Sequence, residues 1–246
     1  MASAPPIDAN PLIVFVHTPK TGGSTINRML ANQFPNGIDH CEHYVDRKRH
    51  LSRSLETADW ISGHMQFRAL HDLLAETTTR PLRFFASVRD PVDQVASHYN
   101  WLIHIYHQSR LRYLRHSAHS RRVSRKLRQT DNTDPAAIIA NLTAHPGLFR
   151  NNQYRTITDR NSRGQNGSLQ ALLEGYEAIM PAERSADLLQ AMTGNPPKTA
   201  ERENQSPYSF DKSLFRSAPV LEFLQDWNSR DFALYHHITS RPRKST

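Results

Sequence analysis

A loop rich in glycine and hydroxyl groups follows the first apolar stretch of the chain. Residues 17–25 read HTPKTGGST and come directly after the run PLIVFV at residues 11–16. Adjacent glycines let backbone N–H groups approach an anion, the hydroxyls donate hydrogen bonds, and Lys20 adds a full positive charge. The order differs from the G-x-x-x-x-G-K-[ST] loop of nucleoside triphosphatases, because the lysine precedes the glycines. The stretch predicts an anion-binding loop, and the alternative is a glycine-rich turn with a surface lysine.

A second group of anion-binding residues follows another apolar run. Arg89 comes directly after LRFFASV at residues 82–88, and Ser97 lies eight residues later in a helix that Pro91 begins. A guanidinium and a hydroxyl together suit a phosphate dianion. Because ligands of open parallel sheets bind beyond the carboxyl ends of the strands, Lys20 and Arg89 are expected at one edge. Two such receptors indicate a ligand with phosphates at two separated positions.

Strands and helices alternate along the chain and must position these residues. Four short apolar runs are typical of strands in a buried parallel sheet: 11–16, 59–64, 82–88 and 176–180. Five segments have helical periodicity or helix-end signals: 23–33, 67–76, the stretch that begins at Pro91, 185–194 and 218–238. The alternation predicts an α/β fold with a central parallel sheet flanked by helices.

The composition along the chain predicts its organisation. Residues 1–10 are rich in Pro, Ala and Ser and are expected to form a flexible N-terminal arm. Residues 11–240 are expected to form a single domain, with residues 104–145 as a basic helical insertion. The polar stretch 195–213 is expected to be a long loop, and residues 241–246 a basic tail.

Positive charge is concentrated in one segment. Between Arg110 and Arg128 there are eight Lys and Arg residues and no acidic residue. Removing these eight from the 31 basic residues of the chain leaves 23, which equals the number of Asp and Glu, so the net charge of +8 belongs to this segment. It predicts a docking surface for an anionic partner. A solvated helical insertion is the alternative.

Cysteine and apolar content indicate the compartment. A single cysteine, Cys41, excludes an intramolecular disulfide and fits a reducing environment. No window approaches the roughly 18 apolar residues that a membrane span needs, and the start of the chain lacks signal-peptide features. We expect a cytoplasmic protein, or a catalytic domain separated from its anchor. No metal site is expected, because the spacing of DHCEHY at 39–44 with His50 matches none of the usual structural zinc pairs.

The two motifs together resemble a known family. HTPKTGGST, followed about 65 residues later by RDPVDQVASHY, is similar to the sulfotransferases that use 3′-phosphoadenosine-5′-phosphosulfate (PAPS). The similarity is greatest to the carbohydrate branch that includes heparan sulfate 2-O-sulfotransferase and its bacterial relatives. It is strong over residues 15–30 and 82–100, and weaker at 62–67, 151–157 and 231–238.

The resemblance implies a P-loop-like three-layer fold and assigns the donor site. It implies that Arg89 and Ser97 hold the 3′-phosphate of PAPS and of the product adenosine 3′,5′-bisphosphate, with no metal required. The residues that it assigns to the 5′-phosphosulfate are Pro19, Lys20, Thr21, Gly22, Gly23, Ser24 and Thr25. It also implies that the positive charge of Lys20 stabilises the leaving phosphate oxygen. The family often has an arginine where this chain has Gln94.

A histidine is the expected catalytic base. The His-Gly-His pattern of the 2-O-sulfotransferases is here Ser62-Gly63-His64, and His64 follows a predicted strand at the active edge. An unperturbed imidazole titrates near pH 6.5, which suits a general base. His64 is therefore the expected base, with Glu42 or His17 as alternatives and a capping histidine as the structural alternative.

These observations predict an enzyme that transfers a sulfuryl group in line from PAPS to a hydroxyl of a carbohydrate or glycoconjugate. The acceptor is expected to be anionic if it binds near Arg110–Arg128. A P-loop-type nucleotide kinase is an alternative, although G-K-[ST] is absent from the sequence. A polyanion-binding protein that uses the basic segment is another alternative, but nothing resembles a module that reads nucleic-acid bases.

Overall fold

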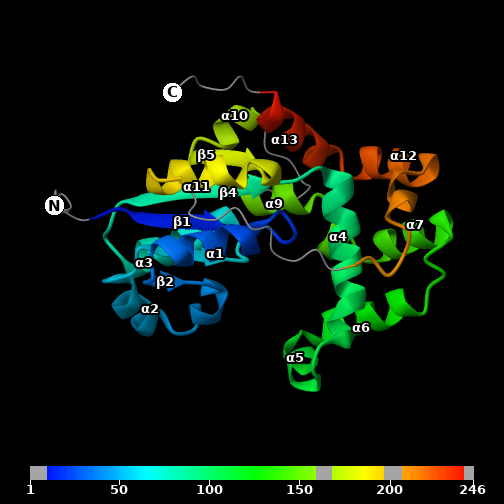
Figure 1. Cartoon of the computed structure of the whole chain (residues 1–246), viewed down its shortest axis with the longest axis horizontal. Coiled ribbons are helices and arrows are strands. Elements are labelled where there is room, and N and C mark those ends of the chain that lie inside the picture. Colours follow the sequence, from blue (N-terminus) through cyan, green and yellow to red (C-terminus); the bar gives the residue numbers. More distant parts are fainter. Residues whose placement is uncertain (1–9, 159–167, 197–206, 241–246) are drawn as a thin grey trace. The chain divides into compact units, whose positions relative to one another are not determined.

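The computed structural model describes residues 10–158, 168–196 and 207–240 (Figure 1). The chain forms two compact units. Of the described residues, 10–89, 153–158, 168–196 and 236–240 belong to the sheet unit, and 90–152 and 207–235 belong to the helical unit. The expected arm at 1–10, apart from Asn10, and the expected tail at 241–246 lie outside the described residues. The single domain over 11–240 stays a prediction.

A sheet of five parallel strands forms the centre of the sheet unit, which confirms the predicted α/β class. The strands are β1 (Leu12–Val16), β2 (Gly37–Ile38), β3 (Trp60–Gly63), β4 (Leu82–Val88) and β5 (Tyr176–Pro181). Their spatial order is β2-β3-β1-β4-β5. Four of them match predicted strands. The sequence did not predict β2, because two residues are too few to show a hydrophobic pattern.

The chain changes direction across the sheet at β1. After β1 it builds β2 and β3 on one side, and it then crosses to add β4 and β5 on the other side. Val16 at the end of β1 pairs with Gly63 of β3 and with Ala86 of β4. The segments that follow β1 and β4 therefore leave the sheet at a topological switch point, where open α/β sheets bind ligands.

Helices cover both faces of this sheet. Helices α1 (Gly23–Gln33) and α11 (Ser185–Thr193) share one apolar cluster with Phe15 and Phe85. On the other face, Phe67 of α3 (Phe67–Thr77) packs against Phe84 and Tyr176, with ring centroids 4.9 and 4.8 Å apart. Phe84 and Phe85 face opposite ways because side chains alternate along a strand.

The remaining short elements of the sheet unit connect these layers. Helix α2 packs beside α3, and α11 ends at Gly194, whose φ of 74° makes it a left-handed C-cap. The other elements are α2 (Lys48–Leu55), the 3₁₀ turns at Cys41–Tyr44 and Ala182–Arg184, α9 (Asn152–Thr158) and α10 (Leu169–Leu172).

The helical unit is built around α4 (Pro91–His104). The side chain of Asp90 accepts a hydrogen bond from the backbone N–H of Asp93 and caps the helix, and Pro91 is its first residue, as the sequence predicted. The other elements of this unit are a 3₁₀ turn at Ile105–His107, α5 (Arg110–Arg115), α6 (Ala118–Arg128), α7 (Pro135–Ala144), α8 (Pro146–Phe149), a 3₁₀ helix at Lys212–Arg216 and α12 (Ala218–Trp227).

The stretch 218–238, which has helical patterning in the sequence, forms two helices. The chain forms α12 and then α13 (Ser229–Thr239), with a break at Asn228, whose φ and ψ are −107° and 24°. Asn228 is fully buried, and its side-chain oxygen accepts a hydrogen bond from the backbone N–H of Asn151. This tertiary contact fixes a non-helical residue inside a stretch whose periodicity continues across it.

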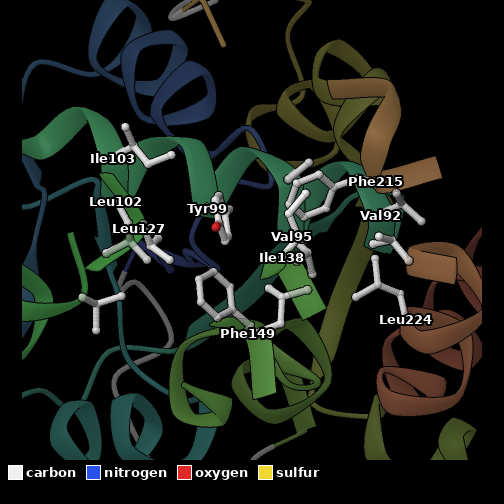
Figure 2. Packing of buried hydrophobic residues seen from close by; sticks show 14 residues of the cluster. Val92, Val95, Tyr99, Leu102, Ile103, Leu127, Ile138, Phe149, Phe215 and Leu224 are labelled. Atoms are coloured by element: carbon white, nitrogen blue, oxygen red, sulfur yellow. The ribbon is translucent and has the colours of Figure 1, made fainter. Parts of the chain in front are cut away.

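The core of the helical unit surrounds Tyr99. One side of α4 is buried, and its residues there include Val92, Val95, Tyr99 and Leu102. Figure 2 shows Tyr99 in the middle of the cluster with Phe149 beside it. The Tyr99 hydroxyl donates to Asn132 Oδ1 at 2.7 Å and accepts from Asn141 Nδ2 at 3.0 Å. The core therefore contains a polar group whose hydrogen bonds are satisfied.

We expect Tyr99→Phe to lower the free energy of unfolding by about 1–2 kcal/mol, because it leaves two amide groups without their shared partner. Urea denaturation measures this change. Tyr106→Phe is the matched control. Tyr106 is 49% exposed, so we expect the loss of its hydroxyl to change the free energy of unfolding little. Equal stability of the two variants would contradict the role assigned to the buried hydroxyl.

Candidate functional site

The loop after β1 contains two residues with a left-handed backbone conformation. Lys20 has φ 68° and Gly22 has φ 85°, so two residues adopt the left-handed region between the strand and α1. Gly22 caps α1 without a side-chain hydrogen bond, and no acidic residue lies in the first turn of the helix. The first N–H groups of a helix lack intrahelical partners and carry its positive dipole end. This helix start therefore suits an anion.

Buried hydrogen bonds fix the loop to the sheet. The Thr21 hydroxyl donates to the backbone oxygen of Thr18 at 2.9 Å, and the Ser87 hydroxyl of β4 donates to the backbone oxygen of Thr21 at 2.9 Å. Gly23 is needed for close packing, because a Cβ there would lie 2.0 Å from the ring of His17. These contacts hold the loop against the sheet.

Two cations meet at this edge, as the sequence predicted. The Arg89 guanidinium donates to the backbone oxygen of Lys20 at 3.4 Å. Burial lowers the pKa of Lys20, and the nearby charge of Arg89 lowers it further. Within residues 10–158, 168–196 and 207–240, neither cation forms an ion pair with a carboxylate. Two mutually repelling cations without an acidic partner favour binding of an anion between them.

Gln153 of α9 holds the backbone of Arg89. Its side-chain oxygen accepts from the Arg89 N–H at 2.8 Å, and its side-chain nitrogen donates to the Arg89 carbonyl at 2.9 Å. Gln153 is 1% exposed, so this amide pair is shielded from water. No residue-level signal in the sequence marks this role, apart from the weak family similarity of NNQYRTI at 151–157.

His64 lies directly after β3 and has a defined tautomer. Its Nδ1 is 2.9 Å from the backbone oxygen of His17, and since a carbonyl only accepts, Nδ1 carries the proton. Nε2 is then the basic nitrogen. Burial of the ring lowers the pKa of His64, although Glu42 opposes this shift, and part of the residue remains exposed. A neutral, partly accessible imidazole can accept a proton.

Glu42 holds the backbone of His64 in place. Its Oε2 accepts a hydrogen bond from the backbone N–H of His64 at 2.9 Å, and its Oε1 is 2.9 Å from His40 Nδ1. Gly63 permits this approach, because a Cβ there would lie 2.8 Å from Glu42 Oε2 and 2.3 Å from Cys41 Sγ. Hydrogen bonds from His40 and from the backbone lower the pKa of Glu42 despite its partial burial. These contacts favour a positioning role for Glu42 over that of a base.

His17 is a poor candidate for the base. It is 5% exposed, and its ring centroid is 4.1 Å from that of His64. Burial first, and then the neighbouring His64, His40 and Lys20, lower its pKa to about 2. A group with this pKa stays neutral at physiological pH but has little affinity for a proton. The geometry therefore favours His64 among the three bases that the sequence proposed.

The other predicted site residues occupy different environments. Ser24 is exposed, while Pro19 and Thr25 are half-buried in the loop and the first turn of α1. Ser97 is half-buried on α4 and belongs to the helical unit, so its pairing with Arg89 stays a prediction. The two positions that depart from the family pattern, Gln94 and Ser62, are fully buried.

Comparisons with protein-family models, with curated proteins and with solved structures found no match to this chain. Over the described part of the chain, no helix has both the length and the apolar character that crossing a membrane requires. The geometry of the site, together with the motif resemblance, is therefore the support for any functional proposal.

Because the folded pKa of His17 lies far below its unfolded value near 6.5, its contribution to stability is complete above pH 6.5 and declines as the pH falls toward 2. Between pH 7 and pH 5, protonation of this one group in the unfolded state lowers the free energy of unfolding by about 2 kcal/mol. Urea denaturation at several pH values measures the slope.

We expect His17→Gln to reduce this slope, whatever its effect on stability at pH 7. His71→Gln, which changes an exposed histidine of α3, should keep it. A slope unchanged by His17→Gln would show that His17 is not the group responsible.

Proposed function

We propose that the protein is a PAPS-dependent sulfotransferase with a P-loop-like sheet unit, acting on a hydroxyl group of a carbohydrate or glycoconjugate. The observation that carries the proposal is the meeting of Lys20 and Arg89 beside the start of α1, with no acidic partner among the residues that the structure describes. This receptor lies at the topological switch point of a parallel sheet. Its cations fit a ligand that carries several phosphate and sulfate oxygens.

The donor would bind along the loop and β4. Residues 19–25 and the first N–H groups of α1 would hold the 5′-phosphosulfate, and Arg89 with Ser97 would hold the 3′-phosphate. Gln153 would fix the backbone of Arg89 and so direct its guanidinium, whose planar fork suits two phosphate oxygens. The bound donor supplies an activated sulfuryl group.

Different residues of the chain have different roles in the reaction. His64 Nε2 accepts the proton of the acceptor hydroxyl, since Nδ1 is held as a donor by the carbonyl of His17. Lys20 and the amide groups of the loop stabilise negative charge on the leaving phosphate oxygen. Glu42 keeps the His64 backbone in place through its hydrogen bond to the N–H. The attack on sulfur and the departure of the phosphate are in line.

The basic helices are the proposed binding surface for an anionic acceptor. Helices α5 and α6 contain eight Arg and Lys residues and no acid. The guanidinium of Arg128 lies 3.6 Å from the ring centroid of Tyr106, which shows a cation supported by an aromatic face. The same helices favour a polyanion-binding protein as the second candidate function. Its binding would depend steeply on salt and would survive Lys20→Ala.

Loss of either cation should abolish most of the transfer. We expect Lys20→Ala and Arg89→Ala each to lower the rate of labelled sulfate transfer by about 100-fold or more. Removing a single group that stabilises charge in the transition state usually lowers the rate by this factor. In calorimetry, only Arg89→Ala should lose the preference for adenosine 3′,5′-bisphosphate over adenosine 5′-monophosphate. Lys48→Ala, which removes a lysine paired with Glu76 on the surface, is the control.

Two results would overturn the proposal. One is the absence of bisphosphate binding at millimolar concentration, and the other is near-wild-type transfer by both variants. Magnesium-dependent turnover of ATP would support a P-loop-type nucleotide kinase or triphosphatase in its place.

His64→Ala should separate binding from chemistry. We expect kcat to fall by about 10²–10⁴-fold, the usual contribution of a general base, while the Kd of adenosine 3′,5′-bisphosphate stays unchanged. The wild-type rate should fall as the pH drops through the pKa of His64, which lies below its usual value. His71→Ala is the control for loss of a histidine from the sheet unit. A variant that kept the wild-type rate and pH profile would exclude His64 as the base.

A further inference from the structure

Three metal-ligating side chains converge on the segment between β2 and α2. Donor atoms of His40, Glu42 and His43 all lie within 4.8 Å of one another. The two imidazole rings are stacked, with centroids 5.8 Å apart, and Glu42 Oε1 is 2.9 Å from His40 Nδ1. The sequence predicted no metal here because the spacing matches no structural zinc pair. That rule concerns closed sites with four protein ligands, whereas three ligands with an open position follow other spacings.

The local backbone holds these side chains together. His40 adopts a left-handed conformation with φ 56°, which is uncommon for a residue other than glycine. Its backbone N–H donates to Asp39 Oδ1 at 2.7 Å, and the same oxygen accepts from Asn27 Nδ2 of α1 at 2.7 Å. The N–H of His43 then donates to the carbonyl of His40 at 3.0 Å and closes a turn. The segment is thus tied to α1, and its ligands do not depend on a free loop.

We propose that His40, Glu42 and His43 form a binding site for a divalent transition metal ion of the Zn²⁺ type. Two imidazoles and one carboxylate are a donor set that suits Zn²⁺ and leaves a coordination position open to water or to a small ligand. This inference does not depend on the proposed transferase activity.

The carboxylate has the support that metal ligands usually require. While Oε1 faces His40, Oε2 is held by the backbone N–H of His64 at 2.9 Å. Such hydrogen bonds fix the orientation of a ligand and raise its affinity for the ion. Metal–ligand distances of about 2.0–2.2 Å require the three donors to move inward. His40 and His43 are exposed, so their side chains can rotate without disturbing a packed core.

Cys41 and His50, which lie nearby in the sequence, are not assigned to the donor set. Cys41 is fully buried, and burial together with Glu42 raises the pKa of its thiol to about 12, which disfavours the thiolate that a metal binds. His50 stacks on Tyr44 with ring centroids 5.6 Å apart. The assigned site therefore has three protein ligands, two of them three residues apart.

Titration of the full chain with Co²⁺ and Zn²⁺ tests the assignment. We expect one equivalent of Co²⁺ to give visible absorption that Zn²⁺ displaces, with affinity falling at low pH as protons compete for the imidazoles. His40→Ala, Glu42→Gln and His43→Ala should each weaken binding at least 10-fold. Circular dichroism confirms that each variant is folded.

The matched control removes another close pair of histidines. The rings of His104 and His107 are 5.7 Å apart in the helical unit, and the double variant His104→Ala/His107→Ala should bind the metal as the wild type does. Lys20→Ala should also keep metal binding, which separates this site from the donor site. Absence of binding at 1 mM Zn²⁺, or equal affinity of His43→Ala and the control, would overturn the proposal.

Discussion

The parallel pairing of β1 with β4 is the constraint on which the candidate site depends. It places two segments that leave the sheet at a switch point side by side, and it brings Lys20 within hydrogen-bonding distance of Arg89. The hydrogen bond from Ser87 in β4 to Thr21 in the loop joins the same two segments. Without this pairing, two cations could not be held together against their mutual repulsion.

Three histidines at this edge of the sheet differ in burial and in protonation. His17 is buried and kept neutral, and His64 beside it is partly accessible with one nitrogen fixed as a donor. His40 is exposed and pairs with Glu42; burial tends to lower the pKa of His40, but Glu42 and Asp39 outweigh it and raise the pKa. His64, the proposed proton acceptor, thus has the neutral His17 on one side and the paired His40 on the other. This arrangement links the loop after β1 to the chemistry that we propose for it.

Much of the sheet unit could be predicted because its signals are local. Short apolar runs in the sequence correspond to β1, β3, β4 and β5. The glycine at position 194 corresponds to the end of α11. The failures have physical causes. β2 is too short to show a pattern, and Asn228 interrupts a helical stretch through a buried contact with Asn151. The convergence of His40, Glu42 and His43 could not be read from the sequence either, because spacing does not reveal a left-handed residue such as His40.

The sequence by itself determined the α/β class, the glycine-rich loop after the first strand, and the segment that carries the net charge. Each of these follows from neighbouring residues, through burial along a strand or the conformational freedom of glycine. Tertiary structure alone decided which residues meet. Lys20 and Arg89 are 69 positions apart, His17 and His64 are 47 apart, and Arg89 and Gln153 are 64 apart. Strand order sets these contacts, because parallel strands bring distant segments to one edge.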